Sequence, residues 1–131
     1  MATEIINAPI DENVRSFIEQ LFPDATVSFG KEDVVFILTE NGIPIGFVHV
    51  SQFKGYGVIR GIGVIEKYRG LGHGNQLMAK GLNLLYFERN VPIVILKVRK
   101  DNRSAIMFYK DKGFKIVKAN TNTLIMARWL C

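Results

Sequence analysis

A glycine-rich segment at residues 69–74 constrains the fold of this chain more than any other feature. It follows a β-rich run at residues 58–65 and precedes a run with helical periodicity at residues 75–88. Glycines lack a Cβ, so several backbone N–H groups can turn toward one anion, and a helix that begins there adds unpaired donors. The sequence therefore predicts a strand, an anion-binding loop and a helix, with Arg69 adding a positive charge.

The spacing within this loop separates three phosphate-binding motifs. A Walker loop ends in Gly-Lys-Ser/Thr, whereas this loop ends with Gly74 and Asn75, which excludes that motif. The dinucleotide fingerprint needs Gly-x-Gly-x-x-Gly, but here the glycines alternate from Gly70 and the preceding strand does not open a βαβ unit. The remaining pattern is Arg-x-x-Gly-x-Gly, formed by Arg69, Gly72 and Gly74.

A second segment, at residues 96–114, carries a matching signal. It predicts a strand, a helix and a turn that ends in Lys112, Gly113 and Phe114. In order and spacing, this segment and the loop resemble the GCN5-related N-acetyltransferase (GNAT) superfamily. The resemblance covers nearly the whole chain after about Ile43, and is strongest over residues 62–74 and 96–114. It implies an acetyl-CoA-dependent N-acetyltransferase, in which a primary amine attacks the thioester directly in a ternary complex.

The periodicity along the chain predicts an α+β fold with a mixed, twisted sheet. Asn41-Gly42 is a strong hairpin signal between two β-rich runs, and Gly113 suits the position just after a helix. By resemblance this is a GNAT-like fold, with about six to seven strands and about three to four helices on both faces. The N-terminal half shows a single convincing helix, at residues 11–22, where the family commonly has two.

Size and composition are those of a single folded domain over residues 1–131, with 48% apolar and 22% charged residues. We expect a cytoplasmic protein without a membrane partner, because no signal-like or spanning apolar segment is visible. The single cysteine, Cys131, cannot form an internal disulfide, and no metal site is expected because neither histidine has a second ligand at suitable spacing. Small proteins of this fold often form dimers, so a homodimer is one expectation.

The resemblance assigns most of the candidate site to cofactor binding. The pantetheine arm would lie along Ile62, Gly63 and Val64, and the Val64 N–H is the candidate oxyanion donor. Three glycines at alternate positions, Gly57, Gly61 and Gly63, would leave one strand face bare for a ligand, or else mark a bulge or crowded packing. The cofactor-binding residues expected in all are Ile62, Gly63, Val64, Arg69, Gly70, Leu71, Gly72, His73, Gly74, Asn75, Asn102, Ala105, Phe108 and Tyr109.

Two side chains are candidates for the proton transfers. Tyr109 matches the family tyrosine that gives a proton to the coenzyme A thiolate, although a helical tyrosine beside Phe108 also suits a core. Asn102 suits a helix cap as well as a pantetheine contact. The strand before the loop carries Arg60 where family members often place a glutamate, so His49 on the preceding strand is the candidate base, acting directly or through water.

The acceptor stays open among a protein N-terminus, a lysine and a small amine. One set of positions resembles the ribosomal-protein alanine N-acetyltransferase branch, namely residues 96–99 with Asn102, Ala105 and Tyr109. Lys97, however, occupies a position where that branch often has glutamate. A net charge of +5 disfavours cationic acceptors unless acidic residues line the cleft. The acidic candidates are Glu4, Asp11, Glu12, Asp33 and Glu40.

Two other classes of function compete. A non-catalytic acyl-CoA-binding module would explain the missing strand carboxylate, and it predicts cofactor binding without turnover. A basic nucleic-acid-binding protein would explain the charge, much of which lies between Lys97 and Lys118. Nucleic acid is not expected as a partner, because no recognisable nucleic-acid motif is present.

Overall fold

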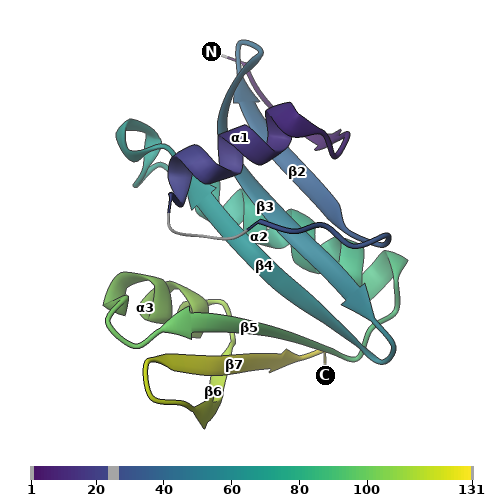
Figure 1. Ribbon diagram of the computed structural model, residues 1–131, viewed down its shortest axis with the longest axis vertical. Helices are drawn as coiled ribbons and strands as arrows, with labels where there is room; N and C mark the ends of the chain where they lie inside the picture. The colour runs from purple at the N-terminus through teal and green to yellow at the C-terminus, as the bar shows by residue number, and fades with distance from the viewer. Residues whose placement is uncertain (1, 24–26, 131) are drawn as a thin grey trace.

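In the computed structural model, which describes residues 2–23 and 27–130, the chain forms one mixed sheet flanked by helices (Figure 1). Cys131 lies outside the described residues. The strands are β1 (Thr3–Ala8), β2 (Val34–Glu40), β3 (Ile43–Phe53), β4 (Tyr56–Val64), β5 (Ile93–Arg99), β6 (Lys115–Ala119) and β7 (Thr123–Trp129). The α-helices are α1 (Glu12–Leu21), α2 (His73–Asn83) and α3 (Arg103–Asp111), and α2 continues into a π-helical turn, Leu84–Glu88.

The strand order confirms the predicted mixed sheet. Within the described residues the order is β1-β2-β3-β4-β5-β7-β6, and all neighbours are antiparallel except β4 and β5. The β2–β3 turn has positive φ angles at Asn41 and Gly42, as a tight Asn-Gly hairpin requires. Gly113 has φ +91° just after α3, so it occupies the left-handed position predicted for it.

The two faces of the sheet are covered by different elements. Helix α1 and residues 27–33 cross one face, over β2 to β4 (Figure 1), where Val14 and Ile18 of α1 pack on Phe47. Helices α2 and α3 cover the other face, and their apolar side chains join one larger core with Leu38, Val48 and other strand residues. We call these the α1 face and the α2 face.

Local sequence explains where each helix begins. The Asp11 side chain accepts a hydrogen bond from the Val14 N–H at 3.0 Å, which caps α1, and Asn102 caps α3 through the Ala105 N–H at 3.2 Å. Helix α2 differs, because its N-cap is Gly72 with no side-chain cap bond. The first N–H groups of α2 are therefore free for another partner.

The sheet opens between β4 and β5. These strands pair in parallel only from Gly57 to Ile59 of β4, opposite Val94 to Leu96 of β5. Beyond Ile59 the two strands carry no further pairing among the described residues, and Figure 1 shows them diverging toward the glycine loop. Position 60 of β4 is a bulge, because Ile59 pairs with Val50 and Gly61 pairs with His49. We call this break in the β4–β5 pairing the gap; it leaves the edge of β4 beyond Ile59 without a strand partner on the side of β5.

Candidate active site

The glycine loop has the backbone geometry of an anion site. Gly70 and Gly72 have φ angles of +78° and +87°, and nothing lies within 4 Å of the position that a Cβ would take at either residue. The Arg69 Nε donates to the Val64 carbonyl at 2.9 Å, which fixes the loop to the end of β4. Because α2 begins at His73 without a side-chain cap, its N–H groups and dipole meet an open space.

Helix α3 packs against this loop. A Cβ at Gly74 would lie 3.4 Å from the Phe108 ring, so that glycine allows the close approach of the helix. Phe108 in turn contacts Tyr109 edge to face, with ring centroids 5.7 Å apart. Two segments that lie more than thirty positions apart in the chain are thereby brought to one site. This arrangement is consistent with a single ligand site that includes the loop, Phe108 and Tyr109.

The free edge of β4 carries unpaired backbone groups. The Ile65 N–H donates to the Ile45 carbonyl at 2.8 Å, and antiparallel pairs alternate, so the odd-numbered residues of this stretch bond to β3. The polar groups of Ile62 and Val64 then point the opposite way, toward the gap beside β5. The Arg69 bond to the Val64 carbonyl agrees with that direction. A pantetheine arm, which contains amides, could bond to these groups along the gap.

The bare glycine face predicted from Gly57, Gly61 and Gly63 is not present. The bulge at Arg60 shifts the alternation, so a Cβ at Gly57 would meet Leu85 on the α2 face, at 2.8 Å. On the opposite face, a Cβ at Gly61 would meet Phe47, and one at Gly63 would meet both Phe22 and Phe47. The glycines serve crowded packing, the alternative reading of the same pattern, and the gap comes from the diverging strands instead.

Tyr109 is mostly buried, and its hydroxyl has no partner in the described part of the chain. Among the described residues the hydroxyl forms no hydrogen bond, yet no fully buried polar side-chain atom is left unpaired, so it retains contact with solvent. Burial raises the pKa of Tyr109 to about 12. The phenol therefore stays protonated near neutral pH, which suits a proton donor and excludes a base.

His49 lies in a buried polar cluster on the α1 face. Its Nε2 is 2.7 Å from Asp33 Oδ2, and the two side chains are only 5% and 6% exposed. Burial lowers the pKa of His49, although Asp33 pulls it upward. Burial alone would raise the pKa of Asp33, but hydrogen bonds involving the Gly30 backbone, His49 and Ser51 lower it overall. When His49 is neutral and its Nε2–H donates to Asp33, the lone pair of Nδ1 is available to accept a proton.

A hollow of about 320 Å³ adjoins this cluster. It opens on the α1 face where Arg60 leaves the β4 bulge, and Arg60 is close enough to lower the pKa of His49 further. The lining residues are Ser28, Phe29, Gly30, Lys31, Glu32, Asp33, Ser51, Gln52, Phe53 and Arg60. Asp33 was predicted only as one acidic residue near a cleft. Its pairing with His49 spans sixteen positions and has no local sequence signal.

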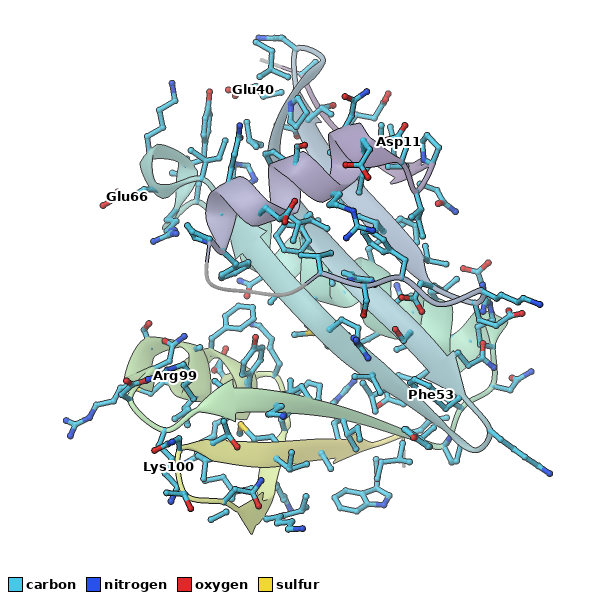
Figure 2. The ribbon with its side chains drawn as sticks, viewed as in Figure 1. Asp11, Glu40, Phe53, Glu66, Arg99 and Lys100 are labelled. Atoms are coloured by element: carbon cyan, nitrogen blue, oxygen red, sulfur yellow. The ribbon has the colours of Figure 1, made fainter. Side chains whose placement is uncertain are left out.

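The other predicted acidic residues lie elsewhere. Glu4 is on β1, Glu12 begins α1, and Figure 2 shows Asp11 and Glu40 at the far end of the sheet from Arg99 and Lys100. Only Asp33 of that set lines the hollow beside His49. The side of the gap that faces α1 is therefore not a generally acidic surface.

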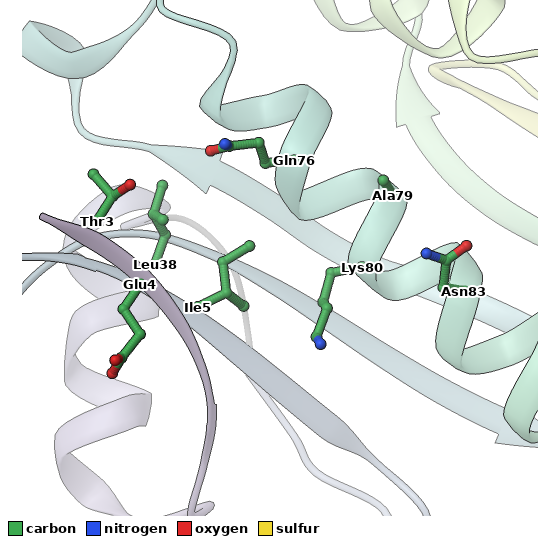
Figure 3. Close-up of a pocket in the computed structure, with 8 residues that line it drawn as sticks. All are labelled: Thr3, Glu4, Ile5, Leu38, Gln76, Ala79, Lys80 and Asn83. Carbon is green, nitrogen blue, oxygen red and sulfur yellow. The ribbon is translucent and has the colours of Figure 1, made fainter.

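A second hollow, of about 300 Å³, lies between β1 and α2 (Figure 3). Its walls come from Thr3, Glu4, Ile5 and Leu38 on one side and from Gln76, Ala79, Lys80 and Asn83 on the other. Apart from Glu4, which was one of the acidic candidates for the acceptor cleft, none of these residues belongs to the predicted site. In the described part of the chain, no group of three or more His, Cys, Asp or Glu residues could hold a metal ion.

Comparison with known proteins settles the family. Residues 4–114 match the family model described as the acetyltransferase (GNAT) family. The chain belongs to the GNAT acetyltransferase family. An N-alpha-acetyltransferase of Sulfurisphaera tokodaii is 40% identical over 78 residues, which are 56% of this chain and 46% of that protein. A mycothiol acetyltransferase of Corynebacterium aurimucosum is 34% identical over 70 residues, 53% of this chain and 23% of that protein. The alignments thus span less than half of either relative.

The fold of this GNAT protein matches a solved structure over nearly the whole chain. The ribosomal-protein-S18-alanine N-acetyltransferase of Escherichia coli superposes with a TM-score of 0.84, covering 98% of this chain and 94% of that one. The sequence identity is 24%, so this likeness shows the fold alone. The GNAT-like architecture predicted from the sequence is confirmed, and the family uses acetyl-CoA. No helix in the described residues has the length and apolar character needed to cross a membrane.

Proposed function

We propose that this protein is an acetyl-CoA-dependent N-acetyltransferase that passes the acetyl group directly to a primary amine. One observation carries the proposal: the β4–β5 pairing ends at Ile59 and the strands diverge toward the glycine loop, so the free edge of β4, the loop and α3 border one gap. The loop geometry fits a pyrophosphate, since Gly70 and Gly72 are open and α2 lacks a side-chain cap. Acetyl-CoA supplies the activated acetyl group.

Each cofactor contact is assigned from this geometry and from the family resemblance. The backbone of residues 69–75 and the Arg69 charge would hold the phosphates, and the free edge at Ile62 and Val64 would bond the pantetheine arm. The Val64 N–H remains the first candidate oxyanion donor, and the Ile62 N–H points to the same gap. Gly63 directs its own polar groups to β3, so it would contribute only close packing.

The α3 helix would close the other side of the cofactor. Ala105 and Phe108 pack with the core beneath the gap, and the Asn102 side-chain oxygen is already engaged in capping the helix. Only the amide nitrogen of Asn102 is then left for the pantetheine. Tyr109 would protonate the leaving thiolate. Its raised pKa keeps the proton on the phenol until negative charge develops, and its unpartnered hydroxyl is free to donate it.

His49 would take the proton from the amine, directly or through a water in the adjoining hollow. It lies opposite Gly61 of β4, on the α1 face, and Asp33 fixes its ring. This dyad offers a base where the usual strand carboxylate is missing. The runner-up function, an acyl-CoA-binding module without turnover, uses the same loop but needs neither Tyr109 nor His49.

Calorimetric titration with acetyl-CoA tests the cofactor site, and the chain offers a matched control. Gly72 and Gly55 have the same φ of +87°, and neither has an atom within 4 Å of the Cβ position. Gly72→Glu should weaken binding by at least about 100-fold, because a carboxylate would face the phosphates. Gly55→Glu, in the β3–β4 turn, introduces the same strain and charge and should bind like the parent. No binding by the folded parent, or equal losses in both variants, would refute the proposal.

A further inference from the structure

One face of the C-terminal part of the sheet has no helix over it. Leu96 and Val98 of β5 and Met126 of β7 face the core beneath α2 and α3. The side chains that alternate with them, such as Ile95, Lys97 and Ile125, therefore face the opposite side. Figure 1 shows α1 in front of β2 to β4 but no helix in front of β5, β7 and β6 among the described residues. We call this uncovered surface the open face.

A row of three cations runs from the mouth of the gap across the open face. Ile59 and Leu96 form the last pair between β4 and β5, so Arg60 and Lys97 are the first residues of the diverging strands. Lys97 pairs with Ile125 of β7, which pairs with Lys118 of β6. Neighbouring strands lie about 4.8 Å apart, so Lys97 and Lys118 are separated by roughly 10 Å at the backbone. We call Arg60, Lys97 and Lys118 the cation row.

These charges are not neutralised within the protein. Arg60, Lys97 and Lys118 are exposed, and none forms an ion pair with any residue that the structure describes. Glu32 and Asp33 line the same hollow as Arg60, but Glu32 pairs with Arg89 at 3.6 Å and Asp33 is bonded to His49 at 2.7 Å. At the other end of β5, Asp101 binds Arg99 at 3.0 Å. A fourth cation, Lys115, is exposed in the next row. The open face thus keeps a positive charge next to the proposed acceptor side.

We propose that the amine acceptor is an acidic polypeptide segment, whose amine enters beside Arg60 and whose following residues cross the open face. This inference rests on the proposed function. A free amino acid, even one with a second carboxylate in its side chain, is too short to reach across the row, which spans four strands. Ile125 lies between Lys97 and Lys118, and Ile95 lies two residues before Lys97 on the same face; both are half-buried and offer apolar contact to an extended peptide. Charge complementarity selects the acidic partner.

Three matched hexapeptides provide the probe, each with a free N-terminal alanine followed by acidic, amide or basic side chains. Steady-state acetylation by the parent should favour the acidic peptide over the amide peptide by at least about tenfold in kcat/KM. The double variant Lys97→Glu, Lys118→Glu should reverse the preference toward the basic peptide. Lys80→Glu, on the opposite face beside β1, carries the same kind of charge change and should keep the parent's preference.

A binding assay separates this inference from the proposed function. Trp129 is the only tryptophan of the chain, is 53% exposed, and lies on the open face in register with Ile93. Its fluorescence should change on titration with the acidic peptide, and the change should weaken in the Lys97→Glu, Lys118→Glu variant. If the acidic peptide binds in this way but no amine is acetylated, the proposed function fails while the acidic-segment site stands.

Three results would overturn the inference. In the first, small amines are acetylated but the three peptides bind and react equally, which leaves the proposed function intact. In the second, the Lys97→Glu, Lys118→Glu variant weakens acetyl-CoA binding rather than peptide selection, which would assign the cation row to the cofactor. In the third, a single-stranded oligonucleotide binds the parent more tightly than the acidic peptide and displaces it, which would assign the row to nucleic acid.

Discussion

The two parts of the sheet differ in how many faces are covered. Strands β2 to β4 are packed between α1 and α2, so both of their faces are covered, and β2 has six consecutive buried residues, whereas the edge strand β1 is mostly exposed. Strands β5, β7 and β6 are packed on one face only, and β6 is exposed at all five positions. Stability is therefore concentrated in the first part. We call these the covered part and the half-covered part of the sheet. The exposed side chains of the half-covered part are available to bind a partner, and the proposed site lies where the two parts meet.

The largest effect on stability should come from Phe47→Ala, at the centre of the covered part. Phe47 is fully buried and contacts Phe17 and Phe22 edge to face, while Gly61 and Gly63 leave room for its ring. Removing the ring should cost about 3–5 kcal/mol of unfolding free energy, because a cavity remains between α1 and the sheet. Urea denaturation measures this loss. A cost below about 1 kcal/mol would mean that α1 is not firmly packed.

The Tyr109→Phe substitution, on α3, should lower the catalytic rate without lowering the stability of the fold. We expect kcat to fall by at least about 100-fold, because the proton donor is lost. Folding should be nearly unaffected near neutral pH, since the hydroxyl has no protein partner among the described residues. Acetyl-CoA affinity, measured by calorimetry, is the control and should stay close to that of the parent. An unchanged kcat would support turnover without this residue, and no turnover in the parent would favour the binding module.

His49→Gln should change how the covered part responds to acid. The native pKa of His49 is lowered by burial, so the unfolded chain takes up this proton first as pH falls below about 6.5. Stability then declines from neutral pH down through the native pKa, by at most about 1.4 kcal/mol per pH unit. The variant should lose this part of the decline in urea titrations at pH 5 and pH 7.

The pH–rate profile tests the catalytic role of the same residue. If His49 is the base, the acidic limb of kcat/KM should vanish in His49→Gln along with most of the rate. A merely structural role predicts a changed stability with an unchanged limb. Asp33 also has a lowered pKa, so its contribution is lost only at more acidic pH, below its unfolded value of 3.8.

The smallest effect should come from Val117→Thr, in the half-covered part. Val117 occupies a bulge in the edge strand β6 and is 50% exposed. An isosteric change there should shift the unfolding free energy by less than about 0.5 kcal/mol. Thermal unfolding of the Val117→Thr and Phe47→Ala variants under the same conditions compares their losses of stability directly. A loss comparable with that of Phe47→Ala would mean that this surface is buried in solution, for example against another copy of the chain.

Local sequence patterns were sufficient to predict most of the helices, strands and turns. The Asn41-Gly42 turn, the α1 cap at Asp11 and the stop at Gly113 were predictable, because each depends on the conformational preference of one or two residues. The helix after the loop begins at His73 and changes to a π-helical turn at Leu84, which the apolar spacing did not reveal. That spacing describes which face is buried and is insensitive to one extra residue per turn.

The glycine strand shows where local reasoning failed. Alternation of Gly57, Gly61 and Gly63 predicts a single bare face only if the strand is regular. The bulge at Arg60 breaks the alternation, and it depends on how β3 pairs with β4, which no short window of sequence contains. The pairing of His49 with Asp33 was missed for the same reason, because the two residues meet only once β2 and β3 are aligned.

By itself, the sequence determined the family, the order of elements and the position of the glycine loop, because these depend on residue types at short spacings. The tertiary structure alone decided where the sheet splits, which strand edge is free and which face stays uncovered. These features follow from pairing and packing among distant segments, whose free energy is gained only when the whole sheet forms. The cation row belongs to this second kind. Arg60, Lys97 and Lys118 are scattered along the chain and become one surface only in the folded protein.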